Sequence, residues 1–258
     1  MRRAIATLLQ DTWLETPARY IHARTVQLLR PGRSQSNEGE ILARLADQTN
    51  APNTFVEFGF HWHEFNCIGL IREYSGLLID GNGRTVRLAR RLFPDNIRVE
   101  ARYLTLENLG WIEQYFAGRP LGILSIDVDG NDYWFLQRLL PMRPAIVAVE
   151  YNASFLLKRI TVPYKPDFDR FKEHASGLYC GASLTALSQL CQQNGYGLVA
   201  VSDSGVNAFF VRSDLLSPDL HARAPEAVYR ECVLTNMWNG STALEQWSVI
   251  QHLDFVEV

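Results

Sequence analysis

Residues 54–82 read TFVEFGFHWHEFNCIGLIREYSGLLIDGN and contain the pattern that decides the fold. Two short apolar runs each end in an acid, Glu57 and Asp80, with a further apolar stretch between them. This pattern predicts strand, loop, helix and strand, with a carboxylate at the carboxyl end of each strand. Ligands of open parallel sheets bind outside these strand ends. The acids stand roughly twenty residues apart, a spacing that suits an acid hydrogen-bonded to a ribose. We therefore expect a nucleoside-shaped ligand.

The composition is that of a soluble globular protein. The 258 residues are 47% hydrophobic and 21% charged, with 25 basic and 28 acidic side chains and a net charge of −3. With this balance the protein has no overall positive charge that would attract nucleic acid or an anionic membrane. No apolar run is long enough to span a bilayer. The four cysteines have no metal-ligand spacing, which indicates reduced thiols and a cytoplasmic location.

Strands that alternate with helices after residue 54 predict an α/β fold. We expect a doubly wound, mostly parallel, Rossmann-like sheet that ends in an antiparallel hairpin. We divide the chain into an N-terminal helical cap (1–50), the α/β domain (51–215) and a C-terminal extension (216–258). The pattern further predicts helices at 18–29, 38–46 and 104–116, and a strand at 253–258.

Residues 153–180 form a connection longer than a strand-to-helix loop requires. The segment carries several aromatic side chains: Phe155, Tyr164, Phe168, Phe171 and Tyr179. Such side chains form either a satellite core or the apolar walls of a ligand site. Because the connection leaves the sheet at the ligand crevice, we expect a lid over the substrate.

The glycine loop after the first strand is unlike a dinucleotide fingerprint. It has Gly59 where that fingerprint needs three glycines, and Phe60 and Trp62 make it a poor pyrophosphate cradle. The loop favours a ligand without phosphates, such as S-adenosylmethionine, and a plain α/β turn is the alternative. His61 and His63 alternate and can face the same side, towards a substrate or as a general base. No third ligand for zinc is evident.

A second acidic motif, Asp127-Val128-Asp129-Gly130, follows a later strand. It is similar to the haloacid-dehalogenase phosphatase signature, with Asn131 in place of threonine and at least two strand–helix units ahead of it. Alternatively, Asp127, Asp129, Glu150 and Asn152 converge at adjacent strand ends. There they could hold Mg²⁺, bind a hydroxyl or ammonium group, or accept a proton, while at least one caps a helix.

Together these motifs resemble the FkbM-type family of S-adenosylmethionine-dependent methyltransferases. The resemblance covers residues 34–212 and is carried by the order and spacing of six segments. They are SQSNEGE (34–40), FVEFG (55–59), GLLIDGN (76–82), LSIDVDGNDYW (124–134), AVEYN (148–152) and GVNAFFV (205–211). The family usually has small residues where this chain has His61-Trp62-His63, which suggests an unusual acceptor.

The resemblance implies a class I methyltransferase sheet and an enzyme that methylates a hydroxyl of a sugar or secondary metabolite. We assign cofactor binding to Glu57, Gly59, Phe60, Asp80, Gly81, Asn82, Tyr103, Leu104 and Asp127. Substrate binding is assigned to His61, His63, Asn131, Tyr151 and Asn152, and catalysis to Asp127, Asp129, Glu150 and His61. A divalent metal is not expected to be obligatory. The expected partner is a small-molecule acceptor, without nucleic acid or membrane, and the oligomeric state stays open, with a homodimer as one option. An FkbM-like binding module without activity is the alternative.

Overall fold

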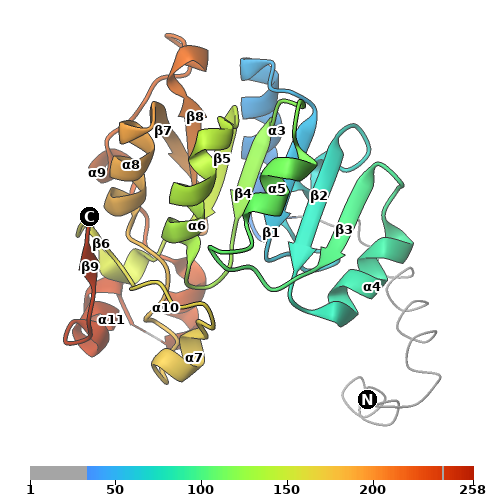
Figure 1. Ribbon diagram of the computed structural model, residues 1–258. Helices are drawn as coiled ribbons and strands as arrows, with labels where there is room; N and C mark the ends of the chain where they lie inside the picture. Colours follow the sequence, from blue (N-terminus) through green and yellow to red (C-terminus); the bar gives the residue numbers. More distant parts are fainter. Residues whose placement is uncertain (1–33, 240) are drawn as a thin grey trace, which may run out of the picture.

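A computed structural model describes residues 34–239 and 241–258. Its main feature is a seven-stranded sheet in the order β3-β2-β1-β4-β5-β8-β7 (Figure 1). The strands are β1 (Thr54–Phe58), β2 (Ser75–Asp80), β3 (Ile97–Ala101), β4 (Ile123–Ile126), β5 (Ile146–Glu150), β7 (Tyr196–Val201) and β8 (Asn207–Arg212). Strand β8 runs opposite to the other six. The predicted doubly wound sheet with an antiparallel hairpin at its end is therefore confirmed.

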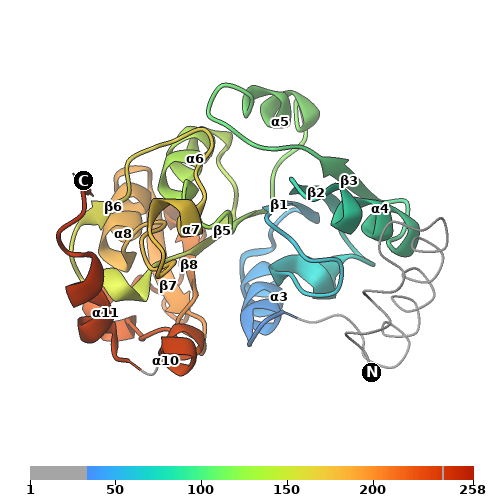
Figure 2. The same ribbon diagram turned by 90° about the horizontal axis from the view of Figure 1, so that it is seen from below.

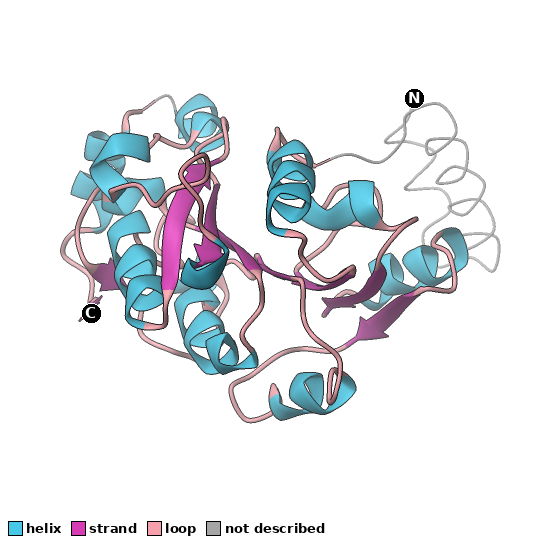
Figure 3. Cartoon of the chain, turned by 90° about the horizontal axis from the view of Figure 1, so that it is seen from above, coloured by secondary structure: helices cyan, strands magenta, loops and turns pink. Residues whose placement is uncertain are grey.

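Helices cover both faces of the sheet (Figures 2 and 3). The α-helices are α3 (Glu38–Thr49), α4 (Gly83–Leu92), α5 (Gly110–Tyr115), α6 (Asp132–Leu139), α7 (Arg170–Glu173), α8 (Leu184–Gln193), α9 (Pro225–Val228), α10 (Val233–Asn239) and α11 (Ala243–Ile250). Short 3-10 helices lie at η1 (Asn66–Leu70), η2 (Leu140–Met142), η3 (Ala153–Phe155) and η4 (Ser213–Leu215). One core joins the sheet to α5, α6 and α8, and a second joins it to α3, η1 and α4. In the described residues, no helix is long and apolar enough to cross a membrane.

A third, smaller core joins the 153–180 insertion to the C-terminal extension. Phe155 and Tyr179 are buried there against Ile250 of α11, with Phe255 packed beside them. The short strands β6 (Ile160–Thr161) and β9 (Val256–Glu257) pair antiparallel and connect the same two segments. Two of the five insertion aromatics are thus buried in a satellite core, and a third, Phe168, packs against it while partly buried.

Two predicted elements differ in extent, and a third cannot be compared. The helix expected at 104–116 begins only at Gly110, because the Asn108 side chain accepts from the Thr105 N–H and donates to the Tyr103 carbonyl. Such local bonds compete with helix formation. The strand expected at 253–258 is limited to Val256–Glu257, and the extension, which has little periodicity, contains three helices. The helix expected at 18–29, like most of the predicted cap, lies outside the described residues.

Candidate active site

A pocket opens where the strand order reverses. Strand β1 lies between β2 and β4, so the chain runs outward in both directions from this point, which is where α/β sheets bind ligands. The pocket contains about 680 Å³ of empty space, part of it open to solvent. It is lined by Phe58, Gly59, Ile79, Asp80, Gly81, Asn82, Arg102, Tyr103, Leu104, Asp127, Val128, Asp129, Asn131, Phe135 and Phe168. The structure thus brings together nine of the sequence-predicted site residues.

Gly59 allows the loops after β1 and β4 to meet. Its φ is +70°, and a Cβ atom there would come within 1.5 Å of the Asp127 carbonyl oxygen. The Asp127 N–H donates to the Phe58 carbonyl at 3.2 Å, which holds the two strand ends together. Only glycine fits this position, because both the backbone conformation and the close approach exclude a side chain.

Glu57 does not reach the pocket. Its carboxylate is buried on the opposite face and accepts from the N–H groups of Asn66 and Cys67 at 2.7 and 2.8 Å. Burial raises the pKa of Glu57 to about 7, although these hydrogen bonds oppose the shift. The side chain fixes the start of η1, so any contribution of Glu57 to the pocket comes through its backbone.

Asp80 lies at the end of β2 and borders the pocket. Its carboxylate accepts from the N–H groups of Asn82, at 2.5 Å, and Phe60, and burial raises its pKa. Asn82 also caps α4 by accepting from the Arg84 N–H at 3.0 Å. The Phe60 ring turns away and packs edge-on against Phe65 in the core.

The loop after β4 presents two aspartates. Asp129 has a φ of +55°, uncommon for a residue other than glycine, and Asp127 and Asp129 both line the pocket. Asp132 holds this loop, since its buried carboxylate accepts from the Val128 and Gly130 N–H groups, each at 2.9 Å. Burial raises the pKa of Asp132 to about 6. Asp132 was not among the predicted site residues; it begins α6, and its carboxylate turns back to the preceding loop instead of capping the helix.

Three predicted substrate contacts are occupied by the protein itself. Asn131 lines the pocket, and its amide donates to the Lys165 carbonyl at 2.8 Å. The Asn152 amide donates to the carbonyls of Leu178 and Cys180 at 2.7 and 2.8 Å, and the Tyr151 hydroxyl donates to the Arg230 carbonyl at 2.7 Å. These side chains hold the insertion and the C-terminal extension in place.

Asp127 and Glu150 lie next to each other at the ends of the paired strands β4 and β5 and form a carboxyl pair. Burial raises the pKa of both groups well above the ordinary range; the charges of Asp129 and Asp132 raise that of Asp127 further, and the charge of Asp127 raises that of Glu150. Asp129 instead forms an ion pair with Arg170, with Nη1 2.5 Å from Oδ1. Within residues 34–239 and 241–258, no three His, Cys, Asp or Glu side chains form a group that could hold a metal.

His61 and His63 contact one another outside the pocket lining. Their Nδ1 atoms are 2.6 Å apart, so one ring donates and the other accepts. Burial, and then the proximity of His63, lower the pKa of His61. The backbone of His61 pairs with that of Glu64, which closes a tight turn, and neither histidine lines the pocket with Asp127 and Asp80.

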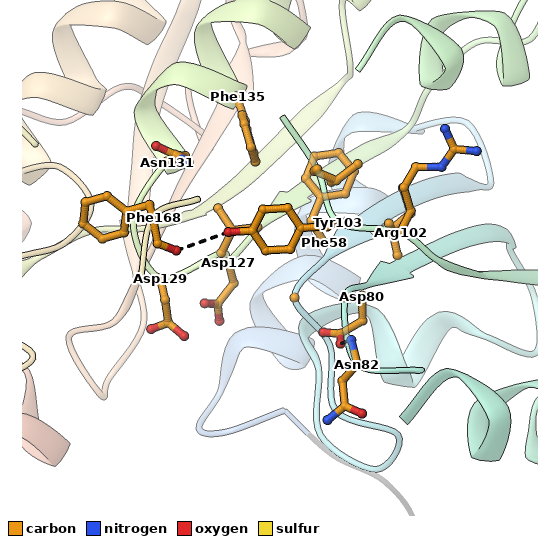
Figure 4. A pocket seen from close by; sticks show the side chains of 15 residues that line it. Phe58, Asp80, Asn82, Arg102, Tyr103, Asp127, Asp129, Asn131, Phe135 and Phe168 are labelled. Atoms are coloured by element: carbon orange, nitrogen blue, oxygen red, sulfur yellow. Dashed lines mark hydrogen bonds between the residues drawn. The ribbon is translucent and has the colours of Figure 1, made fainter. Parts of the chain in front are cut away.

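The insertion closes one side of the pocket through a strap formed by residues 162–172. The Phe168 ring packs on Gly130, where a Cβ atom would come within 2.2 Å of the ring. The Tyr103 hydroxyl donates to the Phe168 carbonyl at 3.3 Å, across the pocket (Figure 4). In the same view the carboxylates of Asp80, Asp127 and Asp129 lie on one side of this bridge. Phe168 belongs to the insertion predicted to form a lid, whereas Arg170 lies far along the chain from the motifs and no local pattern assigns it to the site.

The sheet order and the pocket at its switch point define a Rossmann-like α/β protein. No protein-family model and no curated protein sequence matches the chain.

Solved structures give distant similarities. A protein described as an O-methyltransferase from Klebsiella pneumoniae is 15% identical, with a TM-score of 0.45, over 81% of this chain and 96% of that chain. Magnesium protoporphyrin IX methyltransferase from Synechocystis PCC 6803 with bound SAM is 11% identical, with a TM-score of 0.43 and coverages of 79% and 86%. The N-terminal domain of EvdMO1 with SAH and D-fucose is 12% identical, with a TM-score of 0.43 and coverages of 75% and 94%. Because these likenesses are remote, we base the function on this chain's own residues.

Proposed function

We propose that this chain is an S-adenosylmethionine-dependent methyltransferase of FkbM type, which methylates a hydroxyl of a small sugar- or secondary-metabolite-type molecule. The observation that carries the proposal is the charge of the switch-point pocket. Asp80, Asp127 and Asp129 line it, while its one lining cation among the described residues, Arg102, stacks on Trp111. Phosphates would meet three carboxylates there, whereas a ligand with a sulfonium and an ammonium group would meet complementary charge.

The turn after β1 supports a cofactor without phosphates. Dinucleotide-binding sheets present free N–H groups at a helix N-terminus to the pyrophosphate. Here β1 leads into the 3-10 helix η1, and the N–H groups of Asn66 and Cys67 already donate to Glu57. A pyrophosphate would have to displace a buried carboxylate from these amides, so NAD, FAD and ATP are disfavoured.

The pocket residues fit the parts of S-adenosylmethionine. In our proposal Asp80 accepts from the ribose hydroxyls, and Tyr103 and Leu104 border the adenine. The methionine end lies by Gly59 and Asp127, and the Tyr103–Phe168 bridge closes the site against water. The bound cofactor supplies an electrophilic methyl group, and the protein aligns the acceptor oxygen with the methyl and the sulfur.

A hydroxyl acceptor must lose its proton, and the Asp127–Glu150 pair is placed to take it. The pair lies at the ends of β4 and β5, beside the proposed methionine end, and burial raises the pKa of both groups, which makes either carboxylate a stronger base. The family resemblance does not demand a metal, and a carboxyl pair can accept the proton by itself, so we expect turnover to be unchanged by EDTA. Loss of turnover in EDTA with recovery in Mg²⁺ would instead establish an obligatory metal.

Calorimetry tests the cofactor directly. We expect S-adenosylmethionine and S-adenosylhomocysteine to bind the purified protein, and NAD and ATP to give no heat. Heat from NAD or ATP alone would refute the proposal. Cofactor binding without methyl transfer, across a panel of sugar and phenolic acceptors, would favour a binding module without activity.

A further inference from the structure

A second cavity adjoins the cofactor pocket at the Asp127–Glu150 pair. It contains about 390 Å³ of empty space, much of it open to solvent, and lies between the end of β5, the insertion and α10. Glu150 lines this second cavity and Asp127 lines the cofactor pocket, and the two residues are neighbours at the ends of the paired strands β4 and β5. A molecule in the second cavity would therefore lie beside the carboxyl groups that border the cofactor pocket.

The second cavity offers one anion and one cation for recognition. Glu150 and Arg170 line it, while its other polar side chains, Tyr151, Asn152 and Ser154, already bond to the protein. Arg170 Nε donates to the Gly177 carbonyl at 2.8 Å, and Nη1 donates to Asp129. Nη2 has no hydrogen-bond partner among the described residues, so the guanidinium retains donors for a ligand. The remaining walls are mainly apolar: Ala153, Leu178 and Val206.

The partner of Arg170 is replaceable. The Asp129 side chain is 60% exposed, and exposed ion pairs are weak. Its backbone has a positive φ, which non-glycine residues rarely adopt. A carboxylate that enters the second cavity could therefore take the guanidinium from Asp129 and bind it through two parallel hydrogen bonds.

We propose that the second cavity is the methyl-acceptor subsite and that its acceptor is a small hydroxy acid. This inference rests on the proposed methyltransferase function. Arg170 binds the acceptor carboxylate, and Glu150 binds the hydroxyl that is methylated. The hydroxyl oxygen forms the new bond to the methyl carbon, the carbon–sulfur bond breaks, and its electron pair neutralises the sulfonium. The hydroxyl proton passes to the Asp127–Glu150 pair.

Two matched ligand pairs test the subsite: D-glycerate against glycerol, and D-glucuronate against D-glucose. Binding is measured by ligand-observed NMR on full-length protein saturated with S-adenosylhomocysteine. We expect at least one acid to bind tenfold or more tightly than its neutral counterpart. Arg170→Gln should reduce that affinity to the level of the neutral ligand, and Arg170→Lys should retain part of it. Asp129→Asn should strengthen acid binding severalfold, because it removes the competing carboxylate.

The outcomes separate this inference from the proposed function. If S-adenosylhomocysteine does not bind the wild-type protein, the proposed function fails and the subsite fails with it. If S-adenosylhomocysteine binds but neither acid is preferred, only the subsite is refuted. Equal acid affinity in wild type and Arg170→Gln refutes it as well. An unchanged unfolding temperature in Arg170→Lys and Asp129→Asn excludes a general loss of structure.

Discussion

Replacing Asp80 tests the proposed ribose contact. The Asp80 carboxylate lines the pocket and is held by the N–H groups of Asn82 and Phe60, so its orientation is fixed before a ligand arrives. A hydrogen bond to a charged group contributes about 1.5–3 kcal/mol, and a ribose offers two hydroxyls. Water can enter the space left by Asp80→Ala and hydrogen-bond to the ribose hydroxyls, which restores part of this binding free energy. We therefore take the lower bound of two bonds, about 3 kcal/mol, which weakens S-adenosylhomocysteine binding roughly 100-fold.

Two further variants separate the ribose contact from a change in structure. Asp80→Asn keeps an oxygen for the Asn82 N–H and loses the charge, so we expect about a tenfold loss of affinity, close to the difference between charged and neutral acceptors. Asp219→Ala removes an exposed aspartate outside the pocket and should bind like wild type.

The assay is calorimetric titration with S-adenosylhomocysteine, combined with thermal unfolding of each variant. An Asp80→Ala protein that unfolds cooperatively and binds within twofold of wild type would refute the ribose contact. It would also remove Asp80 from the cofactor site.

Three other changes are expected to have measurable effects. Gly59→Ala should destabilise the protein by more than about 2 kcal/mol in urea unfolding, because residue 59 has a left-handed backbone and a side chain there would clash with the loop after β4. Gly110→Ala is the control and should not destabilise the protein, because the space around Gly110 is open. An equal loss in both variants would contradict this. Because the pKa of Glu57 is raised to about 7 in the folded protein, its contribution to the free energy of unfolding is fully present below pH 4.5, the ordinary pKa of the group. This contribution is lost as the pH rises to about 7. The free energy of unfolding should therefore fall by about 3 kcal/mol more between pH 4.5 and 8 in wild type than in Glu57→Gln; equal slopes would refute the assignment. Trypsin should cut the strap at Lys165 and Lys172 more slowly when S-adenosylhomocysteine is bound, since the strap borders the cofactor pocket; an unchanged cleavage rate would show that the segment is fixed without ligand.

The sequence predicted the fold and the parts of the site that lie directly at strand ends. Gly59, Asp80 and Asp127 each follow an apolar run within a residue or two, and a parallel sheet brings such positions to one edge. The place where each apolar run ends is therefore enough to predict that these three residues lie together. Asp129 follows within the same loop and reaches the pocket for the same reason.

Other parts of the site depend on information that short patterns do not contain. Successive residues of a strand face opposite sides, so Glu57 points to the α3 side while Phe58 faces the pocket. Because both faces of β1 carry apolar residues, its sequence does not show which face lies towards the pocket and which towards α3. Arg170 reaches Asp129 only through the path of the insertion, 41 residues along the chain. That path is set by the satellite core shared with α11, whose residues come from two distant segments.

Glu57 connects the stability of the sheet to the choice of cofactor. In a dinucleotide-binding protein, the N–H groups after the first strand stay open until a phosphate binds them. Here a side chain of the same strand occupies the N–H groups of Asn66 and Cys67, and the Asn66 amide continues the network to Ser125 of β4 at 3.1 Å. A phosphate could bind these amides only by displacing the carboxylate, which would stay buried without its two donors, at about 1–3 kcal/mol and more for a charged group. The contacts that fix β1 against β4 therefore also exclude phosphate-bearing ligands, and the carboxylates left facing the pocket favour a cationic one.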